Sequence, residues 1–363
     1  MLIKAIEDHI FRKAAPLAVR YLAKPDLKAT EPLVRRVLDQ SAREFQVAPP
    51  VTIHMSDPLL MAGMWSATRE AYVVNHKGRA MREAVAAAIS TLNQCPYCVT
   101  VHTSLFASTS IDREDLQDPA KLSPEIRAAY EWANTTLSPH GNRLEGPDIP
   151  PSDLAQIYGT AVVYHYLNRI VSVFLGETPV ALPGMKSTLG DKMMRASFTF
   201  FGKRFANLDP EPGQFILPDD AELPSEFSWA AANPSVAKGL AQFASAASSA
   251  GNEAVPDEVR ALVVEHLGSW HGEQPPLSRN WLGDLVTPLA SEHKPAARLA
   301  LLTARASWQV DDRLISDFRE YNPGDKALLQ IVAWASFAAS RRIASWFVNS
   351  QIHQSTNNEE KAE

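Results

Sequence analysis

The second half of this chain repeats the first, in the same order and displaced by roughly 170 residues. Each repeated segment is short and rich in alanine and aliphatic residues. A tandem duplication of one helical unit explains the matches better than chance, and it restricts the fold to architectures that place two such units in one chain. The matching pairs are 83–89 with 258–264, 124–129 with 295–300, and 168–174 with 341–347.

The sequence predicts an all-α fold, a tandem pair of helical domains. The alternation typical of half-buried strands is scarce, whereas alanine, leucine, arginine and glutamate fill the periodic segments. Thr30 is expected to cap the first helix, and Asp57, which precedes a proline, the second. The predicted helices run over about 31–45, 59–72, 79–93, 124–132 and 152–174, and one more begins at the cysteine motif described below.

At 363 residues the chain exceeds the size at which single cores usually divide, so two domains are expected. A proline-rich stretch indicates a connector between them. Its basic and aromatic segment, 186–205, is interpreted as a helix packed on the domains rather than as an amphipathic membrane or partner helix. The predicted organisation is an N-terminal helical extension (1–29), a domain with the cysteine motif (30–180), the connector (181–226), a second domain (227–350) and a polar C-terminal tail (351–363).

The composition argues against several classes of partner. A net charge of −6 gives no reason to expect nucleic acid or an anionic membrane surface. No apolar run of about 18 residues predicts a transmembrane helix, and the N-terminal segment lacks the apolar core of a signal peptide. No nucleotide-binding or serine-hydrolase motif is found. We therefore expect a cytoplasmic location, where thiols stay available for reversible chemistry.

Both cysteines of the chain lie in one motif, Cys95-Pro96-Tyr97-Cys98. Proline at the second position suits the first turn of a helix, where its missing N–H costs nothing. Cys95 would then lie near the N-cap and Cys98 within the first turn, where free N–H groups and the helix dipole stabilise a thiolate. His102 follows Cys98 by four residues, one turn further along the same face. This pattern indicates redox or nucleophilic chemistry.

The sequence allows other interpretations of the polar residues. The two cysteines and His102 could be three zinc ligands, but no further cysteine or paired-histidine motif completes a site, so neither a metal nor a cofactor is predicted. Glu83, twelve residues before the motif, could be a solvated helix residue or part of a proton relay. His165 is expected to be buried and hydrogen-bonded, although it could face the same cavity. His54 and Trp65 could line a substrate pocket, with core packing favoured for Trp65.

The pattern Glu-x11-Cys-x-x-Cys-x3-His, within EAVAAAISTLNQCPYCVTVHTSLF, resembles the alkylhydroperoxidase D branch of the carboxymuconolactone decarboxylase superfamily. The later stretch YHYLNRIVSVFLG resembles the helix that follows in that family, and the second half of the chain resembles the same fold without the cysteines. The resemblance implies an all-α fold that assembles into oligomers. A fused pair of units could replace a homodimer contact within one chain.

The resemblance also implies a role for each residue of the pattern. Cys98 would be the peroxidatic thiolate that attacks a hydroperoxide and becomes a sulfenic acid, and Cys95 would resolve that acid as a disulfide. His102 and Glu83 would form a proton relay that deprotonates the thiol and protonates the leaving alkoxide. Some members of the family carry a histidine immediately before the second cysteine, where this chain has Tyr97.

The implied function is a thiol-dependent peroxidase or disulfide oxidoreductase. It would reduce a hydroperoxide, be recycled by a dithiol or lipoyl-type protein, and form a homo-oligomer. The alternative is another use of the same fold, as a lyase-type or decarboxylase-like pathway enzyme or a redox-responsive interaction protein. The second copy would be structural, because Trp270, Glu273 and Leu277 stand where the cysteines and the histidine are expected. We nevertheless expect 258–277 to form helices like those of 83–102.

Overall fold

The computed structural model describes residues 19–28, 31–109, 114–141, 144, 149–177, 202, 205, 208–218 and 220–359, with side chains as far as Phe347. Helices dominate this part of the chain, which contains no β-sheet; Val19 and Leu175 meet in an isolated antiparallel bridge. The all-α fold expected from the sequence is confirmed. None of the described helices is long and apolar enough to cross a membrane.

In the described part of the chain, no strand separates one helix from the next. The α-helices are α2 (Pro32–Glu44), α3 (Pro49–Thr52), α4 (Pro58–Thr68), α5 (Arg79–Leu92), α6 (Pro96–Thr109), α7 (Pro124–Ala133), α8 (Pro151–Phe174), α10 (Pro234–Ala254), α11 (Asp257–Gly268), α12 (Trp281–Val286), α13 (Lys294–Ala306), α14 (Asp312–Arg319) and α15 (Asp325–Glu359). A π-helical segment, η2 (Arg69–Val73), extends α4, and short 3-10 helices lie at η3 (His76–Gly78), η4 (Pro119–Lys121), η5 (Ser225–Ala232) and η6 (Ser307–Gln309).

Proline and acidic caps set the starts of the early helices, as their sequence indicates. Helices α2 and α4 each begin with a proline in the first turn, where no N–H is needed. Asp57 caps α4 by accepting from the Leu60 N–H, as predicted. The cap of α2 is Glu31, whose carboxylate accepts two backbone N–H groups; Thr30, the cap expected from the sequence, lies outside the described residues.

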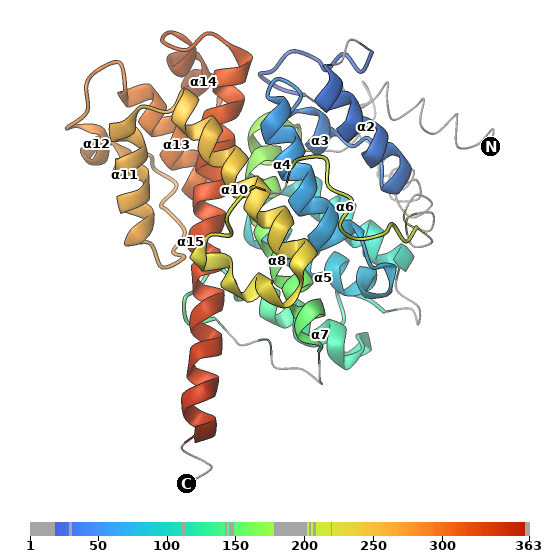
Figure 1. The fold of residues 1–363 in the computed structure, drawn as a ribbon. Helices are drawn as coiled ribbons and strands as arrows, with labels where there is room; N and C mark the ends of the chain where they lie inside the picture. The colour runs from blue at the N-terminus through green and yellow to red at the C-terminus, as the bar shows by residue number, and fades with distance from the viewer. Residues whose placement is uncertain are drawn as a thin grey trace.

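Four helices, two from each half, form the centre of the fold. Helix α4 packs along α10 and α8 along α15, while α10 also contacts α15. In the first half α5 packs on α8 and carries α6 and α7; in the second half α13 packs on α15 and contacts α11, α12 and α14. Figure 1 shows α11 to α14 on one side of α15 and the helices of the first half on the other.

The two halves share one hydrophobic core. A single cluster of buried apolar side chains extends from Val34 in the first half to Phe347 in the second. Helices α4 and α10 approach closely because glycines lie at their crossing. A Cβ atom at Gly239 would lie 2.9 Å from the carbonyl oxygen of Ser66, and one at Gly63 would lie 3.0 Å from a carbonyl oxygen of α10. The crossing therefore has no room for a methyl group.

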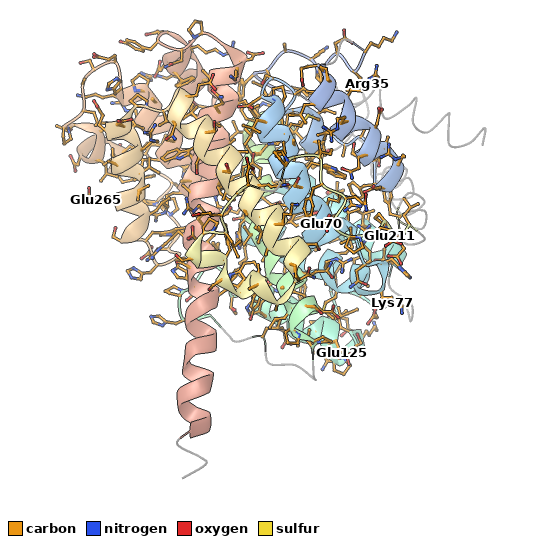
Figure 2. All side chains as sticks on the ribbon, viewed as in Figure 1. Arg35, Glu70, Lys77, Glu125, Glu211 and Glu265 are labelled. Atoms are coloured by element: carbon orange, nitrogen blue, oxygen red, sulfur yellow. A yellow bond between two sulfur atoms is a disulfide. The ribbon has the colours of Figure 1, made fainter. Side chains whose placement is uncertain are left out.

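The described part of the connector is tied to the first half by backbone contacts. The Arg69 guanidinium donates to the Glu211 carbonyl oxygen at 2.6 Å, and the Gly213 N–H donates to the buried Glu70 carboxylate at 3.1 Å. Glu70 is fully buried, and Figure 2 labels it together with Glu211 of the connector, while Glu265 lies at the periphery of the view. The segment 186–205 falls outside the described residues except for two isolated positions.

Three expectations about the chain differ from the structure. Residues 19–28, assigned to an N-terminal helical extension, form no helix. The backbone of α15 continues to Glu359, so most of the segment expected to be a tail is helical. In the second half α11 follows the repeat, but 269–280 is not helical and the next helix, α12, has six residues. Pro275 and Pro276 disrupt helix formation there. Trp270 is nevertheless buried.

We predict that Gly239→Ala destabilises the protein at the α4–α10 crossing. The added methyl group would collide with backbone, which cannot yield as a flexible side chain would. The expected loss is about 1–3 kcal/mol in the free energy of unfolding, measured by urea denaturation. The control is Gly283→Ala in α12, where a Cβ would meet nothing within 4 Å and the helix propensity of alanine should stabilise by about 0.5–1 kcal/mol. Equal stability of the two variants would contradict the close crossing.

Candidate active site

A tight turn between α5 and α6 positions the cysteine motif. The Asn93 N–H closes α5 by donating to the Ile89 carbonyl oxygen at 2.9 Å. Gln94 adopts a left-handed backbone, with φ of 53°, which reverses the chain. The Cys95 N–H then donates to the Ser90 carbonyl oxygen at 3.0 Å, and α6 begins at the next residue. The first cysteine thus lies at the start of the helix, as predicted.

The two cysteines form a disulfide and differ in what they face. Their Cα atoms are 5.4 Å apart, and the Cys98 N–H points at the Cys95 sulfur at 3.4 Å. Both side chains are nearly buried, with exposed fractions of 1% for Cys95 and 4% for Cys98. Cys98 lines a cavity, whereas Cys95 lies behind it in the core. A small molecule in the cavity would therefore meet Cys98.

Glu83 and His102 meet in the interior, one from each of the antiparallel helices α5 and α6. The His102 Nδ1 lies 2.9 Å from the Glu83 Oε2, and both residues are buried. Because a carboxylate only accepts hydrogen bonds, Nδ1 is the donor and Nε2 is the ring nitrogen left to exchange a proton. Glu83 and His102 thus form one contact and the two cysteines another, and Cys98 and His102 line the same cavity.

Two further residues hold the carboxylate of Glu83, and the sequence analysis missed both. The Tyr72 hydroxyl donates to Glu83 Oε1 at 2.6 Å, and a guanidinium nitrogen of Arg79 lies 3.7 Å from the same oxygen. Arg79 also lies over the Tyr72 ring, 5.0 Å from its centroid. Arg79 precedes Glu83 by four residues, a spacing that signals an ion pair on a helix. Tyr72 carries no comparable signal.

The π-helical segment η2 places Tyr72 opposite α5. Its five-residue turn closes with a hydrogen bond from the Val74 N–H to the Arg69 carbonyl oxygen at 3.0 Å. Such segments insert one residue into a helix and often occur at functional sites. The sequence had predicted an ordinary helix as far as Tyr72. The wider turn is a feature of the tertiary structure.

Tyr164 of α8 completes the group around the histidine. Its ring lies edge-on to His102, with centroids 4.5 Å apart, and its hydroxyl is hydrogen-bonded to that of Tyr72. Burial, followed by the nearby charge of Glu83, raises the pKa of Tyr72 well above its usual value. Burial likewise raises the pKa of Tyr164. Both phenols therefore stay protonated and act as hydrogen-bond donors.

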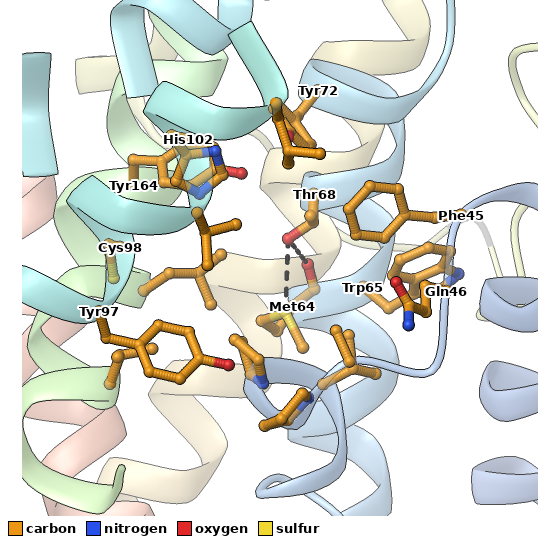
Figure 3. Close-up of a pocket in the computed structure, with 18 of the residues that line it drawn as sticks. Phe45, Gln46, Met64, Trp65, Thr68, Tyr72, Tyr97, Cys98, His102 and Tyr164 are labelled. Carbon is orange, nitrogen blue, oxygen red and sulfur yellow. Dashed lines mark hydrogen bonds between the residues drawn. The ribbon is translucent and has the colours of Figure 1, made fainter. Parts of the chain in front are cut away.

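The cavity beside Cys98 is mainly apolar and has a volume of about 100 Å³. Figure 3 shows Cys98, His102, Tyr72 and Tyr164 on one part of its wall, with Tyr97 reaching across it. The remaining wall is contributed largely by α3, α4 and α8. Its apolar members include Phe45, Pro49, Pro50, Val51, Met64, Trp65, Val101, Leu105, Leu167, Val171 and Phe205.

The other residues considered from the sequence divide between the cavity and the core. Trp65 lines the cavity and donates its indole N–H to Gln40 at 2.9 Å. His54 does not line it: it is buried against Tyr166, and burial lowers its pKa to about 4. His165 is buried between two hydrogen-bond partners, as expected. In the part of the chain that the structure describes, no group of three or more His, Cys, Asp or Glu side chains is arranged to hold a metal ion.

Comparison with known proteins places this site in context. The sequence profile of the carboxymuconolactone decarboxylase family matches residues 60–135, which span α4 to α7 and contain the cysteine motif with Tyr72, Glu83 and His102. The chain is also similar to an alkyl hydroperoxide reductase of Mycobacterium tuberculosis (strain ATCC 25618 / H37Rv). The two are 32% identical over 320 residues, which cover 86% of this chain and 90% of that protein.

We predict that Glu83 stabilises the fold by balancing the charge of the buried Arg79 guanidinium, in addition to its contact with His102. Glu83→Ala would leave the buried Arg79 guanidinium without a carboxylate and should lower the free energy of unfolding by about 3–5 kcal/mol. Adding Arg79→Met should recover part of this loss, which urea denaturation of both variants would reveal. Asp118→Asn, in an exposed ion pair with Lys121, is the control and should have little effect. Additive losses from Glu83→Ala and Arg79→Met would refute the pairing.

Proposed function

The chain belongs to the carboxymuconolactone decarboxylase family, in its alkylhydroperoxidase D-like branch, and we propose that it is a thiol-dependent peroxidase that reduces organic hydroperoxides. The observation that carries the proposal is a disulfide whose Cys98 faces an apolar cavity together with the hydrogen-bonded Glu83–His102 pair. The name of the Mycobacterium tuberculosis relative supports the same activity.

The first step oxidises Cys98 in the reduced protein. His102 accepts the thiol proton at Nε2, while Glu83 holds the opposite ring nitrogen and so orients the ring. The Cys98 thiolate attacks the terminal oxygen of the hydroperoxide. The S–O bond forms as the O–O bond breaks, so that two electrons pass from sulfur to the peroxide. His102 returns the proton to the alkoxide, and the products are an alcohol and a sulfenic acid.

The second step closes the disulfide. Cys95 attacks the sulfenic sulfur of Cys98, a disulfide bond forms and water leaves. The Cα separation of 5.4 Å lies within the usual range for disulfides, so this closure requires little movement of the backbone. Tyr72 and Tyr164 contribute by position. Tyr72 donates a hydrogen bond to the carboxylate of Glu83, and Tyr164 hydrogen-bonds to Tyr72 and packs against the imidazole of His102.

We propose that a dithiol or lipoyl-type protein recycles the enzyme. A dithiol returns two electrons to the disulfide by thiol–disulfide exchange and becomes a disulfide itself. The small exposed fractions of Cys95 and Cys98 favour a reductant that presents its thiols on a slender arm rather than on a flat surface. Such cycling requires a reducing compartment, and the proposal therefore includes a cytoplasmic location.

The division of the chain into an active and a structural copy is part of the same proposal. The pairing of α4 with α10 and of α8 with α15 supports a duplicated unit in which corresponding helices meet. In that arrangement the second half, which has no cysteines, packs against the helices that line the cavity and so supports them. Whether copies of the chain also assemble into a homo-oligomer, as the family suggests, is tested by sedimentation of the purified protein.

We predict that the cysteines cycle as a pair with unequal roles. Treatment of the reduced protein with one equivalent of cumene hydroperoxide should remove two hydrogens, as seen by intact mass. Cys95→Ser should instead yield a sulfenic acid that dimedone labels at Cys98, because the resolving thiol is missing. Cys98→Ser should not react at a comparable rate. Labelling of Cys95 in the latter variant would reverse the assignment.

We predict that His102 and Glu83 act on one proton path. His102→Gln should slow the oxidation of Cys98 at neutral pH by about 10²-fold or more, the usual contribution of a general base. Glu83→Gln should slow it less, and the double variant little more than His102→Gln alone, because both changes disable one path. Stopped-flow measurement of the oxidation rate of each variant at neutral pH tests these expectations. His140→Gln, at an exposed histidine, is the control. If the rate losses of the two single variants were fully additive in the double variant, Glu83 and His102 would not act on one proton path.

A further inference from the structure

The cavity beside Cys98 contains a polar group that no described residue satisfies. Tyr97 is 6% exposed and lines the cavity, yet its hydroxyl has no hydrogen-bond partner among the described residues. The buried hydroxyls of Tyr72, Tyr164 and Tyr166 all have partners. The hydroxyl oxygen is not one of the fully buried polar atoms that lack a partner, so it is open to the cavity rather than sealed in the core. A ligand in the cavity can therefore accept a hydrogen bond from it.

The position of the hydroxyl indicates which part of a ligand it would meet. Figure 3 shows the Tyr97 ring extending from α6 into the cavity, with its hydroxyl directed away from Cys98 and His102. Cys98 and His102 occupy another part of the wall, together with the positioning residues Tyr72 and Tyr164. A hydroperoxide whose O–O group lies at Cys98 would therefore present its organic body, not its peroxide, to Tyr97.

Resting on the peroxidase function proposed above, we infer that Tyr97 selects organic hydroperoxides that carry a second, uncharged oxygen acceptor on an apolar body. The Tyr97 hydroxyl donates a hydrogen bond to that oxygen, such as a ketone or ester carbonyl, while Cys98 attacks the peroxide. The residue that stands where some relatives carry a histidine thus acts in substrate recognition.

The chemistry of the cavity favours hydroperoxides that have an apolar body and an uncharged acceptor oxygen. Burial raises the pKa of Tyr97, so the phenol keeps its proton and serves as a donor. No lysine or arginine is found among the described residues of the wall, so a carboxylate would be buried without a counter-charge, which is costly. The apolar wall favours a hydrocarbon body. Hydrogen peroxide would make neither contact.

The test uses two hydroperoxides of nearly the same shape: cumene hydroperoxide with a para-acetyl group, and its analogue with a para-isopropenyl group, in which a methylene replaces the carbonyl oxygen. The full-length protein is reduced, desalted and mixed with each, and single-turnover oxidation of Cys98 is followed without a reductant. We expect Tyr97→Phe to lower the ratio of the acetyl to the isopropenyl rate by about three- to tenfold, the effect of one neutral hydrogen bond. The isopropenyl rate should change little.

The control is Tyr321→Phe, the same exchange at an exposed tyrosine, which should leave the ratio unchanged. Stability is a second readout: Tyr97→Phe removes an oxygen that has no partner among the described residues, so the midpoint temperature of thermal unfolding should be at or above that of the unmodified protein. An unchanged rate ratio, or a clear loss of stability that assigns the hydroxyl a structural role, would overturn the inference while leaving the peroxidase function intact.

Binding of the alcohol products to the disulfide form separates the two proposals further. Calorimetry with the acetyl and isopropenyl alcohols should show the same selective loss in Tyr97→Phe. If neither hydroperoxide oxidises Cys98 in the unmodified protein, the peroxidase function fails and this inference about its substrate fails with it. If both react and the alcohols bind equally well to Tyr97→Phe and to the unmodified protein, only the inference about Tyr97 fails.

Discussion

The buried carboxylate of Glu83 is the constraint on which the site depends. A charge away from water is tolerated only when it is paired and hydrogen-bonded. Glu83 meets that demand with Arg79 from its own helix, Tyr72 from η2 and His102 from α6. Satisfying one carboxylate therefore fixes three elements relative to one another. The same contacts turn the histidine toward the cavity and hold it in one tautomer.

The cavity is where a substrate could meet Cys98 and the Glu83–His102 pair. Its apolar wall keeps water from competing for the hydrogen bonds and strengthens the electrostatic interactions within it. Cys98 contributes to the wall, while Cys95 stays behind it, so the two sulfurs of one disulfide have different access to a substrate. Helices α4 and α8, which carry Met64 and Tyr164 of the wall, pack on α10 and α15. The half of the chain without cysteines thus supports the cavity from behind.

The sequence predicted most helices of the first half because caps, prolines and apolar spacing act over a single turn. Asp57 at α4 and the start of α6 at the cysteine motif are examples. The helix prediction for the second copy was wrong between 269 and 280, because the match of apolar residues in α11 was extended across Pro275 and Pro276. The sequence also placed the end of the last helix too early, at the polar tail, because polar composition alone does not end a helix.

The sequence by itself indicated the proposed reactive group, because Cys95 directly precedes the helix that carries Cys98 and His102, and the spacing of these residues specifies their relative positions. Glu83 was recognised through a family pattern, and the tertiary structure brought it to the histidine. Only the tertiary structure decided that Tyr72 holds this carboxylate and that the Tyr97 hydroxyl lines the cavity without a partner among the described residues. Those outcomes depend on a π-helical turn and on packing between distant helices, and local spacing carries no information about either.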